Sequence, residues 1–115
     1  MLPIPSKIML SLAPIDMRKS YEGLGVLVQE TLQQDLFSST AFVFLNKRRN
    51  RLKILYWHMN GFCLFQKRLE KGTFALKVKD KVDLCDLTAY QLQGLIQGID
   101  WQQIPEPNVL SYQYL

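Results

Sequence analysis

The sequence predicts an α+β fold, with a mainly antiparallel sheet of four to five strands and two helices packed on one face. Short runs rich in β-branched and aromatic residues follow one another between residues 40 and 68. Turn-forming residues separate these runs, and stretches of helical periodicity lie on both sides. A chain of 115 residues, 48% of them hydrophobic, is long enough to bury one core. We expect residues 1–101 to form a single domain.

The first elements are a strand and a helix. Residues 7–13 (KIMLSLA) form a short apolar run that ends at a proline, which predicts a strand. Asp16 is placed to cap the helix that follows. Its apolar positions share one helical face: Met17, Tyr21, Leu24, Leu27, Val28 and Leu32. Gly23 and Gly25 each weaken a helix by about 1 kcal/mol relative to alanine, so we expect them to admit a close neighbour.

Three consecutive antiparallel strands come next. Residues 40–47 and 51–59 predict two strands, joined by a five-residue hairpin loop at NKRRN. Asn60-Gly61 predicts a type I′ turn, because both residues tolerate a positive φ. Residues 62–70 then return as the third strand.

A fourth strand and a second helix complete the domain. Residues 71–78 predict the strand, with Gly72 in the turn before it. Thr88 and Gln91 have the spacing of a capping box. The apolar stripe of this second helix consists of Leu92, Leu95, Ile96 and Ile99. Residues 102–115 contain two prolines and no periodicity, which predicts an irregular tail.

Positive charge is concentrated in one part of the chain. Eleven Lys and Arg residues fall between Lys47 and Lys81 against Glu70 and Asp80, so the local net charge is +9. The rest of the chain holds three cations and eight acids, a net of −5, and the two parts sum to +4. Such asymmetry favours a polyanionic partner, most simply nucleic acid.

The densest cations lie at the predicted hairpin tip: Lys47, Arg48, Arg49, Arg51 and Lys53. A rigid hairpin with a cationic tip is suited to lie along a phosphate backbone. Further cations at the end of the next strand and just beyond it extend this footprint: Lys67, Arg68 and Lys71. The alternative is a solvated turn that keeps a sheet edge soluble and unpaired.

Arg18 and Lys19 fall in the first turn of the predicted first helix, where the helix dipole disfavours cations. An anion bound at the free amides, and held by Arg18, Lys19 and Ser20, would offset this cost. The alternative is that both side chains point into water, with Arg18 paired to Glu22.

Aromatic residues interleave with the basic segment, and exposed rings beside cations are typical stacking platforms for bases. Most of these rings are expected to fill the core instead. Tyr56 and Trp57 project to opposite faces of their strand, so only one of them can face the helices. The other ring is the better candidate for contact with a partner.

Catalytic machinery is not predicted, and we expect no enzyme activity, no cofactor and no metal. His58 is the single histidine, and no serine or cysteine beside it resembles an activated nucleophile. Cys63 and Cys85 lie among apolar residues and suit buried thiols in a reducing cytoplasm. No apolar segment is long enough to span a bilayer, and the N-terminal run is too short for a signal peptide. We expect a cytoplasmic protein.

Three segments together resemble the TnpB-type accessory proteins of bacterial insertion sequences, in the class numbered sixty-six. They are PIDMRKSYEGLGVLVQE, FVFLNKRRNRLKILYWHMNGFCLFQKRLEKGTF and LTAYQLQGLIQGIDW. The RNA-guided nucleases that share the TnpB name are unrelated. The resemblance covers residues 7–101, and it implies a protein encoded beside a separate transposase. The chain departs from the family in carrying His58 where an acidic residue commonly follows the strand tryptophan, which puts an acid-dependent role there in doubt.

The sequence therefore predicts a non-enzymatic accessory factor of transposition that binds DNA phosphates through the basic hairpin and the helix start. The alternative is a protein-interaction module that docks on the partner transposase without binding DNA. A nuclease is disfavoured, because no set of carboxylates has the spacing of a catalytic site. Pairing of an exposed strand with its symmetry mate, giving a homo-oligomer, is left open.

Overall fold

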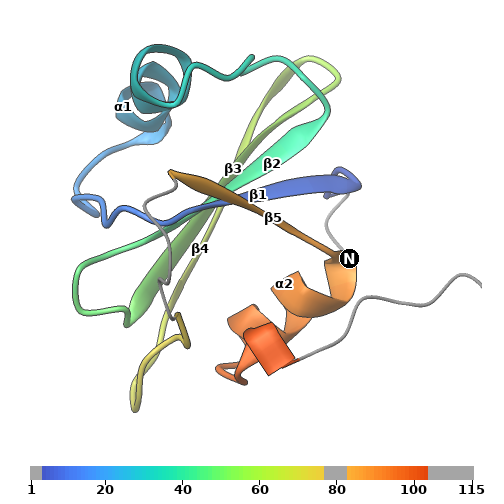
Figure 1. Cartoon of the computed structure of the whole chain (residues 1–115). Helices are drawn as coiled ribbons and strands as arrows, with labels where there is room; N and C mark the ends of the chain where they lie inside the picture. The colour runs from blue at the N-terminus through green and yellow to red at the C-terminus, as the bar shows by residue number, and fades with distance from the viewer. Residues whose placement is uncertain (1–3, 77–82, 104–115) are drawn as a thin grey trace, which may run out of the picture.

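A five-stranded sheet forms the centre of the molecule, with strand order β4-β3-β2-β1-β5 (Figure 1). The computed structural model describes residues 4–76 and 83–103. Its elements, in chain order, are β1 (Lys7–Ser11), α1 (Tyr21–Val26), β2 (Thr40–Leu45), β3 (Arg51–His58), β4 (Gly61–Arg68), β5 (Leu84–Leu87) and α2 (Ala89–Ile96). A π-helical turn (Leu27–Thr31) extends α1, and a 3-10 turn (Trp101–Gln103) follows α2.

The sheet is mostly antiparallel, which confirms the predicted fold class. Strands β2, β3 and β4 form the predicted run of three consecutive antiparallel strands. Among the described strands, only β1 and β2 pair in parallel, because the chain crosses over through α1 between them. Strand β5 pairs antiparallel with β1 at the far edge.

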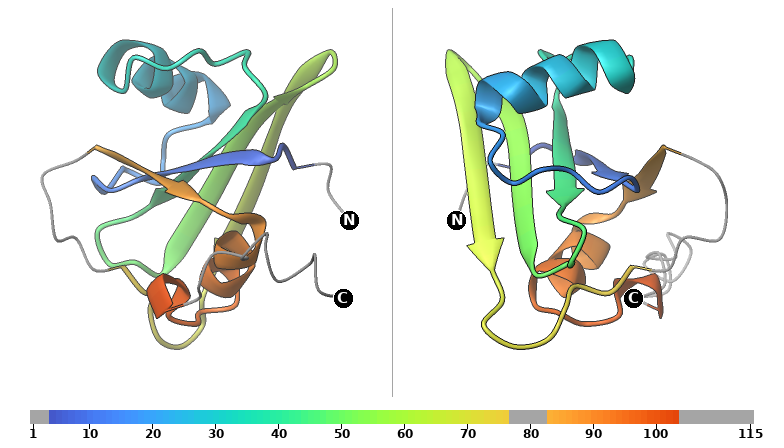
Figure 2. Two further views of the ribbon diagram at one scale, coloured as in Figure 1. Left: turned by 45° about the vertical axis from the view of Figure 1, so that its right-hand side comes forward. Right: turned by 90° about the vertical axis from the view of Figure 1, so that its left-hand side faces the viewer.

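The two helices lie on opposite faces of the sheet, so the prediction of two helices on one face is wrong (Figure 2). On one face, Phe42 and Phe44 of β2 pack with Leu24 of α1. On the other, Val43 packs in one cluster with Leu95 of α2. All six residues of β2 are buried, because successive side chains of a strand point to alternate faces and a helix covers each face.

The loop between β2 and β3 spans residues 46–50, as predicted. The side-chain oxygen of Asn46 accepts hydrogen bonds from the backbone amides of Asn50 and Arg51, each at 3.0 Å. Arg49 adopts a positive φ of 57°. A single asparagine therefore organises the turn from within.

The turn between β3 and β4 lies one residue earlier than predicted. Met59 takes the positive φ, at 56°, and Gly61 is already the first residue of β4, paired with His58. The Asn-Gly dipeptide predicted the hairpin correctly but placed its turn one residue too late.

The first helix begins at Tyr21, with Ser20 as its N-cap, so the prediction that Asp16 caps it is wrong. The Asp16 carboxylate accepts from the Arg18 amide at 2.9 Å and forms a local turn instead. Gly25 admits a close neighbour as predicted, because a β-carbon there would lie 2.9 Å from Leu36 Cδ2.

Residues 73–76 do not form the predicted fourth strand; the extra strand is β5. Two of their backbone groups bond outside the sheet: the Phe74 amide donates to the Arg49 carbonyl, and the Ala75 carbonyl accepts from Trp101 Nε1, each at 2.6 Å. The rest of the predicted strand, residues 77 and 78, lies outside the described residues. Gly72 lies in the turn as predicted, with φ 76°.

The second helix has the predicted capping box between Thr88 and Gln91. Leu92 and Leu95 are buried as predicted, whereas Ile99 lies beyond the end of the helix and is 52% exposed. Most of the predicted tail, residues 104–115, lies outside the described residues. Within residues 4–76 and 83–103, no helix is long and apolar enough to cross a bilayer.

Candidate functional site

Four cations from separate parts of the chain surround one hollow of about 350 Å³ on the α1 side of the sheet. We call them the basic cluster: Lys47, Arg48, Arg51 and Arg68. All four side chains are exposed. Other walls of the hollow come from the segment before α1, at Ile15, Asp16 and Met17, and from Asn46 and Asn50. The fold thus gathers charges from the loop after β2, the start of β3 and the end of β4.

Arg51 and Arg68 lie directly opposite each other on β3 and β4. Like charges in directly opposed positions of an antiparallel pair destabilise the sheet. The repulsion is strongest at a non-hydrogen-bonded position, where the side chains are closest. The ladder puts this pair in such a position, because the Leu69 amide bonds the Asn50 carbonyl at the next position along. An anion between the two guanidinium groups would remove the repulsion.

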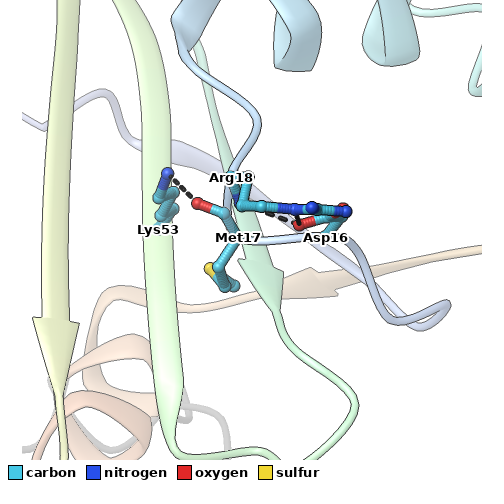
Figure 3. Close-up of polar contacts among 4 residues, drawn as sticks. All are labelled: Asp16, Met17, Arg18 and Lys53. Carbon is cyan, nitrogen blue, oxygen red and sulfur yellow. Dashed lines mark hydrogen bonds and ion pairs between the residues drawn. The ribbon is translucent and has the colours of Figure 1, made fainter.

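Asp16 is the one carboxylate that lines the hollow among the described residues, and Arg18 already neutralises it (Figure 3). The closest approach between the two groups is 2.6 Å, from Arg18 Nη2 to Asp16 Oδ2. Hydrogen bonds from the Arg18 side chain and backbone lower the pKa of Asp16 from 3.8 to about 2. The four cations of the cluster therefore keep their charge uncompensated by this acid.

Lys53 does not belong to the basic cluster, although the sequence placed it at the hairpin tip. Its side chain is buried, with only 8% of the residue exposed. The ammonium donates to the carbonyl oxygen of Met17 at 2.7 Å (Figure 3). It also donates to the carbonyl oxygen of Lys19 at 2.8 Å. Lys53 thus holds the segment before α1 against β3 and is not free to contact a phosphate.

Arg49 and Lys67 are also occupied by backbone carbonyls. Arg49 Nη1 donates to the carbonyl of Leu76 at 2.6 Å, and Lys67 Nζ donates to the carbonyl of Ile96 at 2.8 Å. Ile96 is the last residue of α2, so the Lys67 charge lies at the negative end of that helix. Lys67 is on the α2 side of the sheet, away from Arg68.

The remaining predicted cations are exposed but do not line the hollow: Arg18, Lys19 and Lys71. Arg18 and Lys19 precede α1, so the prediction that they lie in its first turn is wrong, whereas anion binding at the helix start stays a prediction. The predicted pairing of Arg18 with Glu22 is replaced by the pairing with Asp16.

Sequence reasoning missed a cluster of four rings at the opposite end of the β3–β4 hairpin, also on the α1 side. We call it the ring cluster: Tyr21, Phe37, Trp57 and Phe62. Phe62 is its centre, with ring centroids 4.9 Å from Trp57, 5.6 Å from Phe37 and 6.2 Å from Tyr21. Tyr21 and Phe37 are 47% and 55% exposed. Tyr56, by contrast, is fully buried on the α2 side.

Comparisons with known proteins identify what the chain is similar to. The family described as IS66 Orf2-like protein matches residues 6–106. The uncharacterized protein y4jC of Sinorhizobium fredii (strain NBRC 101917 / NGR234) is 34% identical over 99 residues, covering 85% of this chain and 83% of the relative. The uncharacterized protein y4hO of the same strain is 33% identical, covering 79% and 78%. No solved structure matches.

Proposed function

The chain belongs to the IS66 Orf2-like family, as the resemblance in its sequence implied, and from this premise we propose that it binds DNA phosphates through the basic cluster. The family makes it an accessory protein of an insertion-sequence element. In our proposal the role is non-enzymatic: the protein holds DNA for the transposase of the same element.

The observation that carries the proposal is the convergence of Lys47, Arg48, Arg51 and Arg68 around one hollow. Repulsion among these groups costs folding free energy, and the directly opposed pair Arg51 and Arg68 adds to it. Among the described residues, Asp16 is the only acid in the wall, and it is held by Arg18. A site built in this way gains most from an anion with several oxygen atoms, because each guanidinium group can make two parallel hydrogen bonds to a phosphate.

The proposed contact surface is smaller than the ten residues proposed from sequence. Three of the ten donate hydrogen bonds to backbone carbonyls, and we assign them a structural role: Arg49, Lys53 and Lys67. Three others are exposed, and we place them at the margin of the contact surface: Arg18, Lys19 and Lys71. Contacts of this kind bind the backbone without reading bases, so we propose affinity for DNA with little dependence on sequence.

The proposal is tested by titrating labelled duplex DNA with the wild-type protein and with Arg48→Glu. We expect the substitution to weaken binding, because it replaces an attraction to phosphate with a repulsion. Lys7→Glu is the matched control, since it changes the charge equally. Lys7 pairs with Thr40 at the start of β2, whereas the basic loop follows the end of β2.

If both substitutions weaken DNA binding equally, the effect depends on net charge alone, which would contradict a localised site. Binding of the protein to its transposase in a nuclease-treated extract, combined with no affinity for DNA, would instead support the alternative of a protein-docking module. The family implies association with the transposase of the element, so both arms of the experiment address a relevant partner.

A further inference from the structure

Strand β4 ends the sheet with an open edge eight residues long. No other strand of the described residues lies beyond it, and the views of the ribbon show its outer side uncovered (Figure 2). It contains no proline, and all eight of its residues stay in register with β3. Long, regular and apolar edges are templates for pairing with another chain, which natural proteins usually block.

The hydrogen-bond ladder identifies the residues that face outward. The Leu69 amide donates to the Asn50 carbonyl of the chain before β3, at 2.8 Å. Backbone bonds across an antiparallel pair recur at every second residue, so the odd-numbered residues of β4 face β3. The outward amides and carbonyls therefore belong to Phe62, Leu64, Gln66 and Arg68.

We propose that this edge pairs with the β4 edge of a second copy of the same chain, in antiparallel register, to give a symmetric dimer with a continuous ten-stranded sheet. The half-buried side chains of Phe62, Cys63, Leu64 and Phe65 become covered there. A two-fold axis perpendicular to the sheet relates the copies, so both basic clusters end on one face.

Charge selects the antiparallel direction. The cations of β4 are confined to its end, at Lys67 and Arg68. In a parallel pairing with matched ends, these residues would lie beside their own copies and repel. In an antiparallel pairing they lie at opposite ends of the interface, beside uncharged residues of the other copy.

The register follows from the outward residues and the ring cluster. When Phe65 faces its own mate, Leu64 faces Gln66 of the second copy and Phe62 faces Arg68 of the second copy. Each hydrogen-bonded pair then joins two outward residues. The guanidinium group of Arg68, repelled by Arg51 within its own chain, meets the central ring of the partly exposed ring cluster, where a cation–π contact forms. The symmetry creates this contact twice.

The mass of the wild-type protein in solution, measured by light scattering across a dilution series without DNA, tests the proposal. We expect a mass near twice the 13.4 kDa of one chain. Gln66→Pro removes an outward amide without removing a bond to β3, and its side chain is exposed. Because the symmetry removes two hydrogen bonds, we expect the dimer dissociation constant to rise about tenfold or more. Gln66→Thr keeps the amide and is the matched control.

A cysteine at the symmetric position tests the register. Phe65→Cys, with Cys63 and Cys85 replaced by serine, is expected to form a disulfide-linked dimer on mild oxidation. In this register the two copies of residue 65 form a non-hydrogen-bonded pair, whose α-carbons lie about 4.5 Å apart. A monomeric wild-type protein at every concentration would overturn the proposal. So would an unchanged dimer in a folded Gln66→Pro variant. If that variant does not fold, absence of the Phe65→Cys cross-link overturns the proposal and its formation supports it.

Discussion

Lys53 and Met17 are joined by a hydrogen bond of 2.7 Å between the Lys53 ammonium and the Met17 carbonyl, 36 residues apart in sequence. A second bond from the same ammonium reaches the Lys19 carbonyl. These bonds fix the segment that supplies one wall of the basic hollow. The structural role of Lys53 and the binding role proposed for its neighbours can therefore be separated by substitution.

Lys53→Met is expected to lower the free energy of unfolding by about 1–3 kcal/mol, because two carbonyls lose the donor that the ammonium supplies. Lys47→Met, at an exposed position in the wall of the hollow, is expected to stay within about 0.5 kcal/mol of wild type. Urea unfolding measures both. Equal stability of the two variants would contradict a structural role for Lys53.

Arg48 and Arg49 provide a second comparison between adjacent cations. Arg49→Met loses the bond to the Leu76 carbonyl and is expected to cost about 1–3 kcal/mol of stability. Arg48→Met is expected to keep wild-type stability and to weaken DNA binding. Thermal unfolding and DNA titration on the same two preparations measure both effects; a reversed pattern would contradict the assignments.

Gly25 and Gly23 are expected to respond to alanine with opposite signs. A β-carbon at Gly25 would lie 2.9 Å from Leu36 Cδ2, and such overpacking typically costs about 1–3 kcal/mol. At Gly23 the nearest atom is Lys19 Cβ at 3.4 Å, so Gly23→Ala is expected to stabilise the helix by up to about 1 kcal/mol. The midpoints of denaturant unfolding measure both changes in stability. A change of the same sign in the two variants would contradict the prediction.

Asp16 is expected to titrate with a pKa of about 2, below its ordinary 3.8, because Arg18 donates hydrogen bonds to its carboxylate. A depressed folded-state pKa means that the stabilisation is present above about pH 3.8 and is lost as the pH falls through about 2. Carbon chemical shifts of the carboxyl group measure this pKa. Arg18→Ala should return it towards 3.8, and an unchanged pKa in that variant would exclude Arg18 as the cause.

Local signals in the sequence predicted the hairpins well, because those signals act between near neighbours. The NKRRN loop lies at residues 46–50, and Thr88 and Gln91 form their capping box. The start of α1 was not predictable in the same way, since the carbonyls of Met17 and Lys19 bond to Lys53 across the fold. An unbroken apolar run at β2 was the available sign that both faces of the sheet are covered.

The candidate site, like the fold, was predictable only where local sequence determines it. Sequence identified a basic hairpin but could not tell which cations bond to carbonyls, because Arg49, Lys53 and Lys67 find their acceptors on distant segments. Strand alternation would have separated Lys67 from Arg68, which project to opposite faces. The ring cluster needed the tertiary contact between α1 and β4.

The salt dependence of DNA affinity tests the central claim most directly. If Lys47, Arg48, Arg51 and Arg68 each contact one phosphate, log K should fall against log salt with a slope of roughly −0.9 × 4, or about −3.6 per chain bound. Removal of two contacts by Lys47→Glu with Arg48→Glu should bring the slope to about −1.8 or flatter. A slope near zero in the wild-type protein, or an unchanged slope in the double variant, would contradict the account.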